Sequence, residues 1–198
     1  DPDGATRVRA ARALGKAASP AATAALAAAL EDDALWFVRA ECATALGKIR
    51  TKAARDALLA ETQQDDPRVR RAVASALGAF RHDTIAAEGL IEMLGAGEKA
   101  PGVLHDAAVA LGRTRTGEAY EILTGLFDRV SWNDNAWRGA LTGLGELRDD
   151  DALDEVMACT GAHCPDGVRS AATAALAHLG LNEAAVRGRR SEEHTSEL

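Results

Sequence analysis

Three residues with the chemistry of zinc ligands lie close together near the C-terminus. Cys159, His163 and Cys164 form a Cys-x-x-x-His-Cys run. Zinc prefers thiolate and imidazole ligands, and a structural zinc site needs four of them. No second ligand pair follows in the sequence, so this run predicts a loop with incidental thiols rather than a metal centre.

One cysteine and two histidines are the candidates for nucleophilic or general-base catalysis. His82 and His105 each precede an aspartate that could orient the imidazole ring. No nucleophile is spaced to join them, so surface or capping roles are expected. Cys42 lies at an apolar position of a repeated phrase and is predicted to be a core residue. We therefore expect no catalytic residue, no cofactor-binding residue and no metal ligand in this chain.

Two further sets of residues could bind a ligand or a partner. One set consists of arginines that follow the opening residue of the repeated phrase: Arg7, Arg39, Arg70 and Arg169. Stacked helices would align these arginines into a ladder. We favour pairing of each guanidinium with a carboxylate or loop carbonyl between repeats over a ligand site. The other set is Trp36, Trp132 and Trp137, near predicted helix starts, where packing is the simpler role and an exposed ring would be an anchor for a partner.

An internal repeat positions all of these residues. The pattern Asp-x-x-Val-Arg-x-x-Ala-x-x-Ala-Leu-Gly is clearest at residues 66–78. Within each copy the apolar residues fall at i, i+4, i+7, i+8 and i+11, which is one face of a helix. The marker leucine recurs at intervals of 31 to 34 residues, at Leu14, Leu46, Leu77, Leu111, Leu144 and Leu176.

A second apolar helix is predicted after each of the first five copies, over residues 21–30, 53–60, 85–94, 118–127 and 152–158. Asp66 is placed to cap a helix that starts at Pro67, and Asp3 and Asn133 hold equivalent positions. A lone helix pair cannot cover its apolar face, so the pairs must stack. The sequence predicts an all-α fold, an α-solenoid of about six helix pairs over residues 1–189. The glycines after the marker leucines would allow tight packing or end the helix: Gly47, Gly78, Gly112 and Gly145.

Composition agrees with a folded helical chain and limits the partners. Hydrophobic residues make up 47% of the chain, charged residues 27% and aromatic residues 4%. The net charge of -7 disfavours nucleic acid, and no apolar run is long enough to predict a membrane segment. An odd number of cysteines, three, favours a reducing compartment, and we expect the cytoplasm.

The repeated phrase resembles the short HEAT repeats of the phycobilisome-lyase type. Tetratricopeptide and ankyrin repeats have similar periods, but their signature phrases are missing. A narrower resemblance, at residues 36–41, 48–58, 66–73 and 131–134, is to the C-terminal helical domain of aminopeptidase N-type zinc metallopeptidases. Its most specific part is the Ser-Trp-Asn step at residues 131–133 before Gly-Ala-Leu at 139–141, whereas residues 100–103 lack an aromatic expected there.

The peptidase resemblance implies a non-catalytic segment that covers the catalytic cleft of a parent enzyme. The zinc would then belong to the neighbouring catalytic domain, which would be the main partner, because this chain has no H-E-x-x-H motif. The alternatives are a free-standing HEAT scaffold that binds another protein and an accessory subunit of a phycobilin-lyase-type system. We expect a fragment with both ends truncated, and we expect residues 190–198 to be the translation of a sequencing adapter.

Overall fold

The computed structural model describes residues 3–95 and 97–180, and every regular element in these ranges is helical. Two short 3-10 turns, η1 and η2, precede the helices α9 and α10. The bounds are α1 Gly4–Ala17, α2 Pro20–Asp32, α3 Trp36–Ile49, α4 Lys52–Ala60, α5 Pro67–Leu77, α6 Thr84–Gly95, α7 Pro101–Thr114, α8 Ala119–Thr124, η1 Trp132–Asp134, α9 Asn135–Leu147, η2 Asp150–Ala152, α10 Leu153–Ala158 and α11 Asp166–His178.

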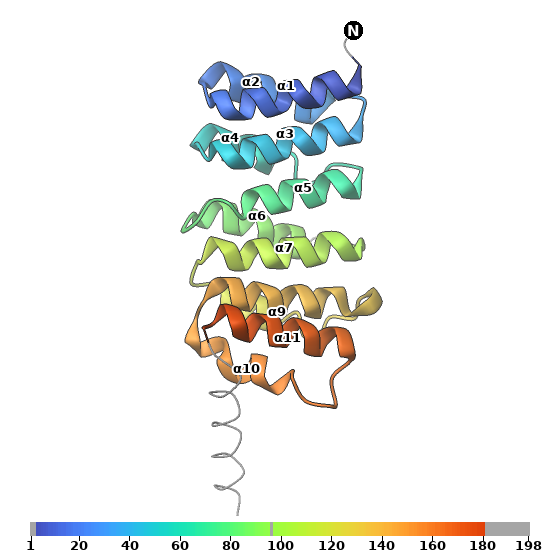
Figure 1. Cartoon of the computed structure of the whole chain (residues 1–198), viewed down its shortest axis with the longest axis vertical. Coiled ribbons are helices and arrows are strands. Elements are labelled where there is room, and N and C mark those ends of the chain that lie inside the picture. The colour runs from blue at the N-terminus through green and yellow to red at the C-terminus, as the bar shows by residue number, and fades with distance from the viewer. Residues whose placement is uncertain (1–2, 96, 181–198) are drawn as a thin grey trace, which may run out of the picture.

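The helices form a stacked row rather than a bundle. The first helix of each pair contacts the first helix of the next pair, from α1 through α3, α5, α7 and α9 to α11, along the long axis of the molecule (Figure 1). The second helices α2, α4 and α6 lie beside them in the same order. The predicted all-α solenoid is confirmed, with five pairs and the first helix of a sixth in the described residues. Residues 190–198 and their expected adapter origin lie outside the described residues.

The predicted apolar register is the core of the stack. In α3, α5 and α7 the residues at i, i+4, i+7 and i+8 are all buried, as at Val69, Val73, Ala76 and Leu77. The marker leucines Leu46, Leu77 and Leu111 have no exposed surface. Leu14 is only partly buried because α1 has a neighbouring first helix on one side alone. Each internal pair therefore depends on the pair before it and the pair after it.

Helix caps follow the prediction at two positions and depart from it at a third. The Asp66 carboxylate accepts a hydrogen bond from the Arg68 N–H at 2.9 Å, and the Asp3 carboxylate accepts one from the Thr6 N–H at 2.7 Å. The prediction for Asn133 is wrong. Asn133 lies inside η1 with a φ of 53°, and α9 begins two residues later. Asp134 is at the N-cap position of α9, and the Ser131 hydroxyl accepts a hydrogen bond from the Ala136 N–H at 2.9 Å.

The glycines that follow the marker leucines allow close helix packing. A Cβ on Gly47 would lie 2.8 Å from the Ala76 Cβ in the next first helix. A Cβ on Gly112 would overlap the backbone of Gly143, which replaces the alanine of other repeats. α3, α7 and α9 continue past their glycine, so only Gly78, directly after α5, also marks a helix end.

The last two second helices, α8 and α10, are the shortest, with 6 residues each. The helix predicted over 118–127 ends at Thr124, and the one predicted over 152–158 begins as the 3-10 turn η2. Residues 125–134 then connect α8 to α9, whereas the connections between the other pairs are shorter: 33–35, 61–66, 96–100 and 159–165. None of the described helices is long and apolar enough to span a membrane.

Candidate functional site

The cysteine and histidine candidates do not assemble into a reactive site. Cys159 and Cys164 are buried, whereas His163 between them in the sequence is exposed. Across residues 3–95 and 97–180, no three His, Cys, Asp or Glu residues converge in a way that could hold a metal ion. Cys42 is buried, as predicted, and burial raises the pKa of its thiol to about 12. A thiol with such a high pKa is not a nucleophile at neutral pH.

The two His-Asp pairs have structural contacts. His82 is exposed, and its backbone N–H donates to the Thr114 carbonyl at 2.6 Å. Asp83 caps α6 through the Ala86 N–H at 3.0 Å and pairs with Arg55 at 2.9 Å. In the second pair the His105 imidazole lies 3.0 Å from the carboxylate of the adjacent Asp106. Surface and capping contacts therefore account for both pairs.

The predicted arginine ladder forms, and its contacts lie between repeats. Arg39 donates to the Asp33 carbonyl at 2.6 Å, in the connection that precedes its own helix. Arg70 donates to the Gln64 carbonyl at 2.6 Å in the same way. Arg7 pairs with the Asp33 carboxylate at 2.8 Å, and Arg169 donates to the Cys164 carbonyl at 2.7 Å. The prediction that each guanidinium pairs with a carboxylate or loop carbonyl is confirmed.

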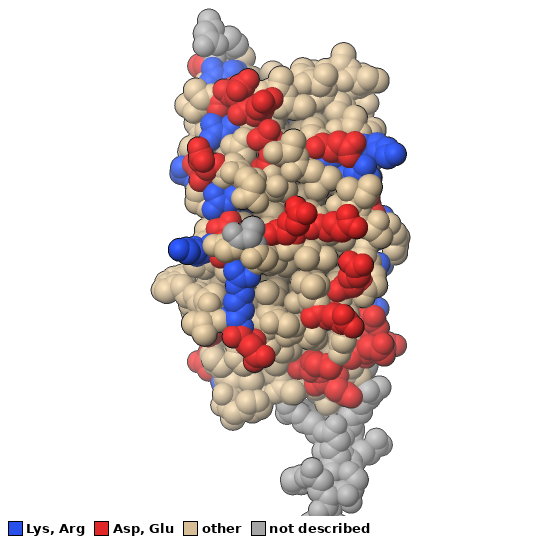
Figure 2. Space-filling view, turned by 180° about the vertical axis from the view of Figure 1, so that it is seen from behind, with Lys and Arg blue, Asp and Glu red and all other residues tan. Residues whose placement is uncertain are grey.

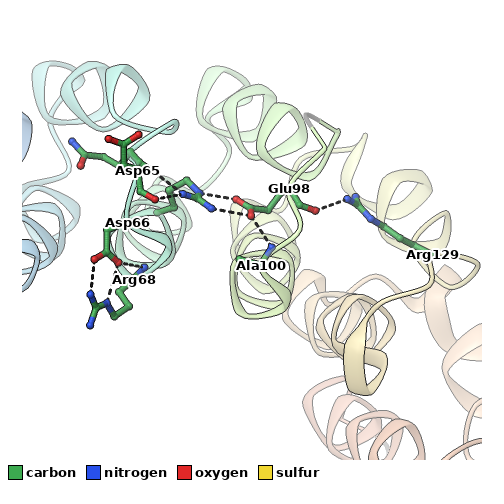
Figure 3. A network of polar contacts seen from close by, with 8 residues as sticks. Asp65, Asp66, Arg68, Glu98, Ala100 and Arg129 are labelled. Carbon is green, nitrogen blue, oxygen red and sulfur yellow. Dashed lines mark hydrogen bonds and ion pairs between the residues drawn. The ribbon is translucent and has the colours of Figure 1, made fainter.

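The ladder is interrupted in the fourth and fifth repeats. The equivalent positions there are occupied by Leu104 in α7 and Trp137 in α9. In the fourth repeat, Arg129 from the connection between α8 and α9 supplies the missing contacts. It donates to the Leu94 carbonyl and, at 3.1 Å, to the Glu98 carbonyl; Figure 3 shows the contact with Glu98. Sequence reasoning missed Arg129 because it lies outside the repeated phrase; the signal available was the absence of an arginine at position 104.

Glu98 contacts both Arg129 and the ladder arginine Arg70. Its carboxylate accepts two hydrogen bonds from Arg70, at 2.6 and 2.9 Å, and one from the Ala100 N–H at 2.8 Å (Figure 3). Burial alone would raise the pKa of Glu98, but the hydrogen bonds from Arg70 and Ala100 hold this pKa below its usual range. Residues 97–100 are therefore fixed from both sides, by Arg70 and by Arg129.

The segment that follows Arg129 carries the most exposed large apolar side chains of the described residues. Val130 is 98% exposed and Trp132 is 76% exposed. Trp36 is less exposed, because the Arg68 guanidinium lies 3.8 Å from its ring centroid. Trp137 is half-buried against Phe127, with 6.0 Å between the ring centroids. Trp132 is thus the most exposed of the three tryptophans.

A groove of about 370 Å³ lies between this segment and residues 97–101. We call it the Trp132 groove and define it by Lys99, Pro101, Leu104, Arg129, Val130 and Trp132. A second hollow of about 340 Å³, which Gln64, Arg70 and Met93 help to line, lies on the other side of Glu98. The two hollows share residues 97–99 and so form neighbouring parts of one surface.

The comparison with known families identifies the repeat. A family model described as HEAT repeats matches residues 1–65 and 55–137. The chain belongs to the HEAT-repeat family. No curated protein sequence matches this HEAT-repeat chain.

Solved structures share the fold of this HEAT-repeat chain at low sequence identity. One is the complex of CpcE and CpcF of phycocyanin lyase from Nostoc sp. PCC7120, with 23% identity, a TM-score of 0.58, and coverage of 94% of this chain and 88% of that chain. Two engineered proteins are 19% and 21% identical, with TM-scores of 0.53 and 0.54. These two matches cover 91% and 90% of this chain, and 92% and 94% of the engineered chains. These matches do not support the resemblance to aminopeptidase N, which stays a prediction from the sequence.

Proposed function

We propose that this HEAT-repeat chain is a non-catalytic scaffold that binds another protein, with Trp132 and Val130 as the anchor of the interface. The observation that carries the proposal is the exposure of these two side chains, 76% and 98%, on a segment that Arg129 fixes to the stack. Tryptophan is enriched among the residues that contribute most to protein–protein binding. A fixed segment also loses little conformational entropy when it docks.

The surface around the anchor suits a protein partner. The Trp132 groove and the hollow beside it, about 370 and 340 Å³, offer concave walls next to protruding apolar side chains. A specific interface buries about 800 Å² on each partner, which is more than one loop provides. We therefore expect the partner to contact residues 62–65 and 97–101 as well as the connection between α8 and α9.

The comparison with CpcE and CpcF supports a partner on a separate polypeptide, because that structure is a complex. An accessory subunit of a phycobilin-lyase-type system is one such role. The sequence resemblance to aminopeptidase N, through Ser131, Trp132 and Asn133, favours a second candidate, in which the partner is a catalytic domain of the same polypeptide. An upstream H-E-x-x-H motif in the gene would select the second candidate, and further repeats or an unrelated domain would select the first.

The test is capture followed by reconstitution. The purified chain is immobilised and exposed to an extract of the source cells, and each retained protein is purified and titrated against the chain by calorimetry. We expect one retained protein to bind stoichiometrically and Trp132→Ala to weaken binding by about tenfold or more, equivalent to about 1.4 kcal/mol.

Trp36→Ala is the matched control, since it removes the same side chain at the start of α3, away from the Trp132 groove. Circular dichroism establishes that both variants keep their helical content. Equal binding by the wild type and Trp132→Ala would refute the assignment of the anchor.

A further inference from the structure

We propose that the Trp132 groove accepts an extended acidic segment of the partner, one that alternates carboxylate and apolar side chains. The inference rests on the proposed scaffold function and specifies the chemistry of the segment that the scaffold takes. The inference follows from a comparison of the charged groups at the groove that have a partner of opposite charge in the protein with those that do not.

Two cations at the groove have no carboxylate partner within residues 3–95 and 97–180. The Glu98 carboxylate, the acidic group in the lining, is held by two of the three nitrogens of the Arg70 guanidinium and has only 8% of its side chain exposed. Arg129 donates to two backbone carbonyls, which satisfy its hydrogen bonds but leave its charge uncompensated. Lys99 is exposed, and in the described part of the chain neither Lys99 nor Arg129 forms an ion pair. The groove is therefore a cationic site in a chain of net charge -7.

Apolar walls accompany these cations. Leu104 replaces the ladder arginine of other repeats, and Pro101, Val130 and Trp132 complete the lining. A small anion such as phosphate would satisfy the cations but would leave Val130 and Trp132 exposed to water. A segment with alternating side chains could cover both, because successive side chains of an extended chain point to opposite sides. This is why a polypeptide fits the groove better than a free anion.

The rest of the same face disfavours nucleic acid. The second helices α6, α8 and α10 contain no Lys or Arg and five acidic residues: Glu88, Glu92, Glu121, Asp154 and Glu155. Figure 2 shows acidic side chains over much of this side of the stack, with most of the visible basic side chains towards one edge, among acidic ones, and a further basic group at the opposite edge. A nucleic acid long enough to extend beyond the groove would bring its phosphates close to these carboxylates, which would repel them. A short acidic segment confined to the basic edge would not.

The experiment uses labelled peptides as probes. Three fluorescein peptides of about ten residues, roughly 33 Å when extended, share their leucine and phenylalanine positions and carry glutamate, lysine or serine between them. Fluorescence anisotropy with the full chain measures each affinity. We expect the glutamate peptide to bind about tenfold more tightly than the serine peptide, and we expect this preference to shrink as salt screens the charges. An excess of inorganic phosphate should not displace the glutamate peptide.

Lys99→Glu tests the source of the preference, and Lys48→Glu is the matched control. Both lysines are exposed, but Lys48 lies in α3, outside the groove lining. We expect Lys99→Glu to lower the affinity for the glutamate peptide about tenfold and Lys48→Glu to leave it within about twofold. Arg129 is left intact because it fixes the segment that carries Trp132.

Several results would overturn the inference. They are equal or tighter binding of the lysine peptide, no binding of any peptide, displacement of the glutamate peptide by phosphate, or an unchanged preference in Lys99→Glu. These outcomes are separate from a failure of the scaffold. If Trp132→Ala still weakens binding of the captured partner, the scaffold function stands and only the proposal of an acidic segment is wrong. If Trp132→Ala has no effect on the captured partner, the scaffold anchor itself has failed.

Discussion

The first three repeats and the two that follow solve the same packing problem in different ways. In α1, α3 and α5 the arginine that satisfies the connection between repeats comes from the repeat's own first helix, as Arg39 and Arg70 do. In the fourth repeat the same contacts come from Arg129, which belongs to the connection beyond α8. The connections before α3 and α5 are therefore bound by an arginine of the helix that follows them, whereas the connection before α7 is bound by an arginine from beyond α8.

This difference determines where the exposed surface lies. Because Arg129 reaches back to residues 94 and 98, the connection that carries it is drawn along the edge of the stack. Val130 and Trp132, which follow, then face solvent instead of packing between repeats. In the regular part, Trp36 is covered by Arg68 of the next repeat. In this chain, the candidate binding surface arises where the repeat departs from its own pattern.

The largest effect is expected from the regular core. Leu77→Ala removes a fully buried side chain from the centre of the stack, and it should lower the free energy of unfolding by about 2 to 5 kcal/mol. Leu14→Ala, at the equivalent position of the first repeat, should cost less because Leu14 is only partly buried. Urea titration followed by circular dichroism measures both. An unchanged urea unfolding transition for Leu77→Ala would contradict the assignment of the marker leucines to the core of the stack.

The contact between α7 and α9 sharpens the comparison. Gly112→Ala should lower the free energy of unfolding by about 2 kcal/mol, since the added Cβ would overlap the Gly143 backbone. Helix propensity alone predicts the opposite sign, because alanine is favoured over glycine by about 1 kcal/mol. Gly117→Ala is the control, as a Cβ there meets no atom within 4 Å. If Gly112→Ala is as stable as wild type, the first helices of the irregular repeats are not in close contact.

Much of this architecture follows from the sequence because it repeats. The period, the register and the ladder of Arg7, Arg39, Arg70 and Arg169 each recur, so every copy supports the others. The cap at Asn133 was predicted wrongly because the assignment carried the regular pattern into a segment where a 3-10 turn shifts the helix start. The role of Arg129 and the exposure of Trp132 could not be predicted, because both depend on a contact between residues about 30 positions apart that occurs only once.

The two kinds of arginine contact should differ in cost. Arg70→Ala would leave the Glu98 carboxylate mostly buried without its cation, and we expect a loss of about 2 kcal/mol after allowance for partial solvent screening. Arg129→Ala removes hydrogen bonds to two neutral backbone carbonyls and leaves no charge without its partner, and we expect about 1 kcal/mol. Urea titrations of both variants at neutral pH give the comparison. A larger loss for Arg129→Ala would mean that the irregular repeat, and not the ladder, carries the stability.

The Arg70 effect should also depend on pH. The pKa of Glu98 is lowered in the folded chain, so its contribution is complete above the pKa of the unfolded state and is lost as the pH falls through the folded pKa. The stability difference between wild type and Arg70→Ala should therefore be largest near neutral pH and shrink in acid to the part that the carbonyl contacts of Arg70 contribute. Measurement of both proteins from pH 7 down to about pH 3 covers this range. A difference that stays constant with pH would show that Arg70 acts through its carbonyl contacts alone.

The smallest change in stability is expected from Trp132→Ala, and a small change would show that the Trp132 ring is not needed for packing. With 76% of its side chain exposed, Trp132 makes few contacts to lose, and the free energy of unfolding should stay within about 0.5 kcal/mol of wild type. Trp137→Ala, five positions away, should cost about 2 kcal/mol because its ring packs on Phe127. If Trp132→Ala proved as costly as Trp137→Ala, the ring would belong to the packing of its own repeat. The distinction between regular and irregular repeats would then lose its functional meaning, since a side chain needed for folding is not free to anchor a partner.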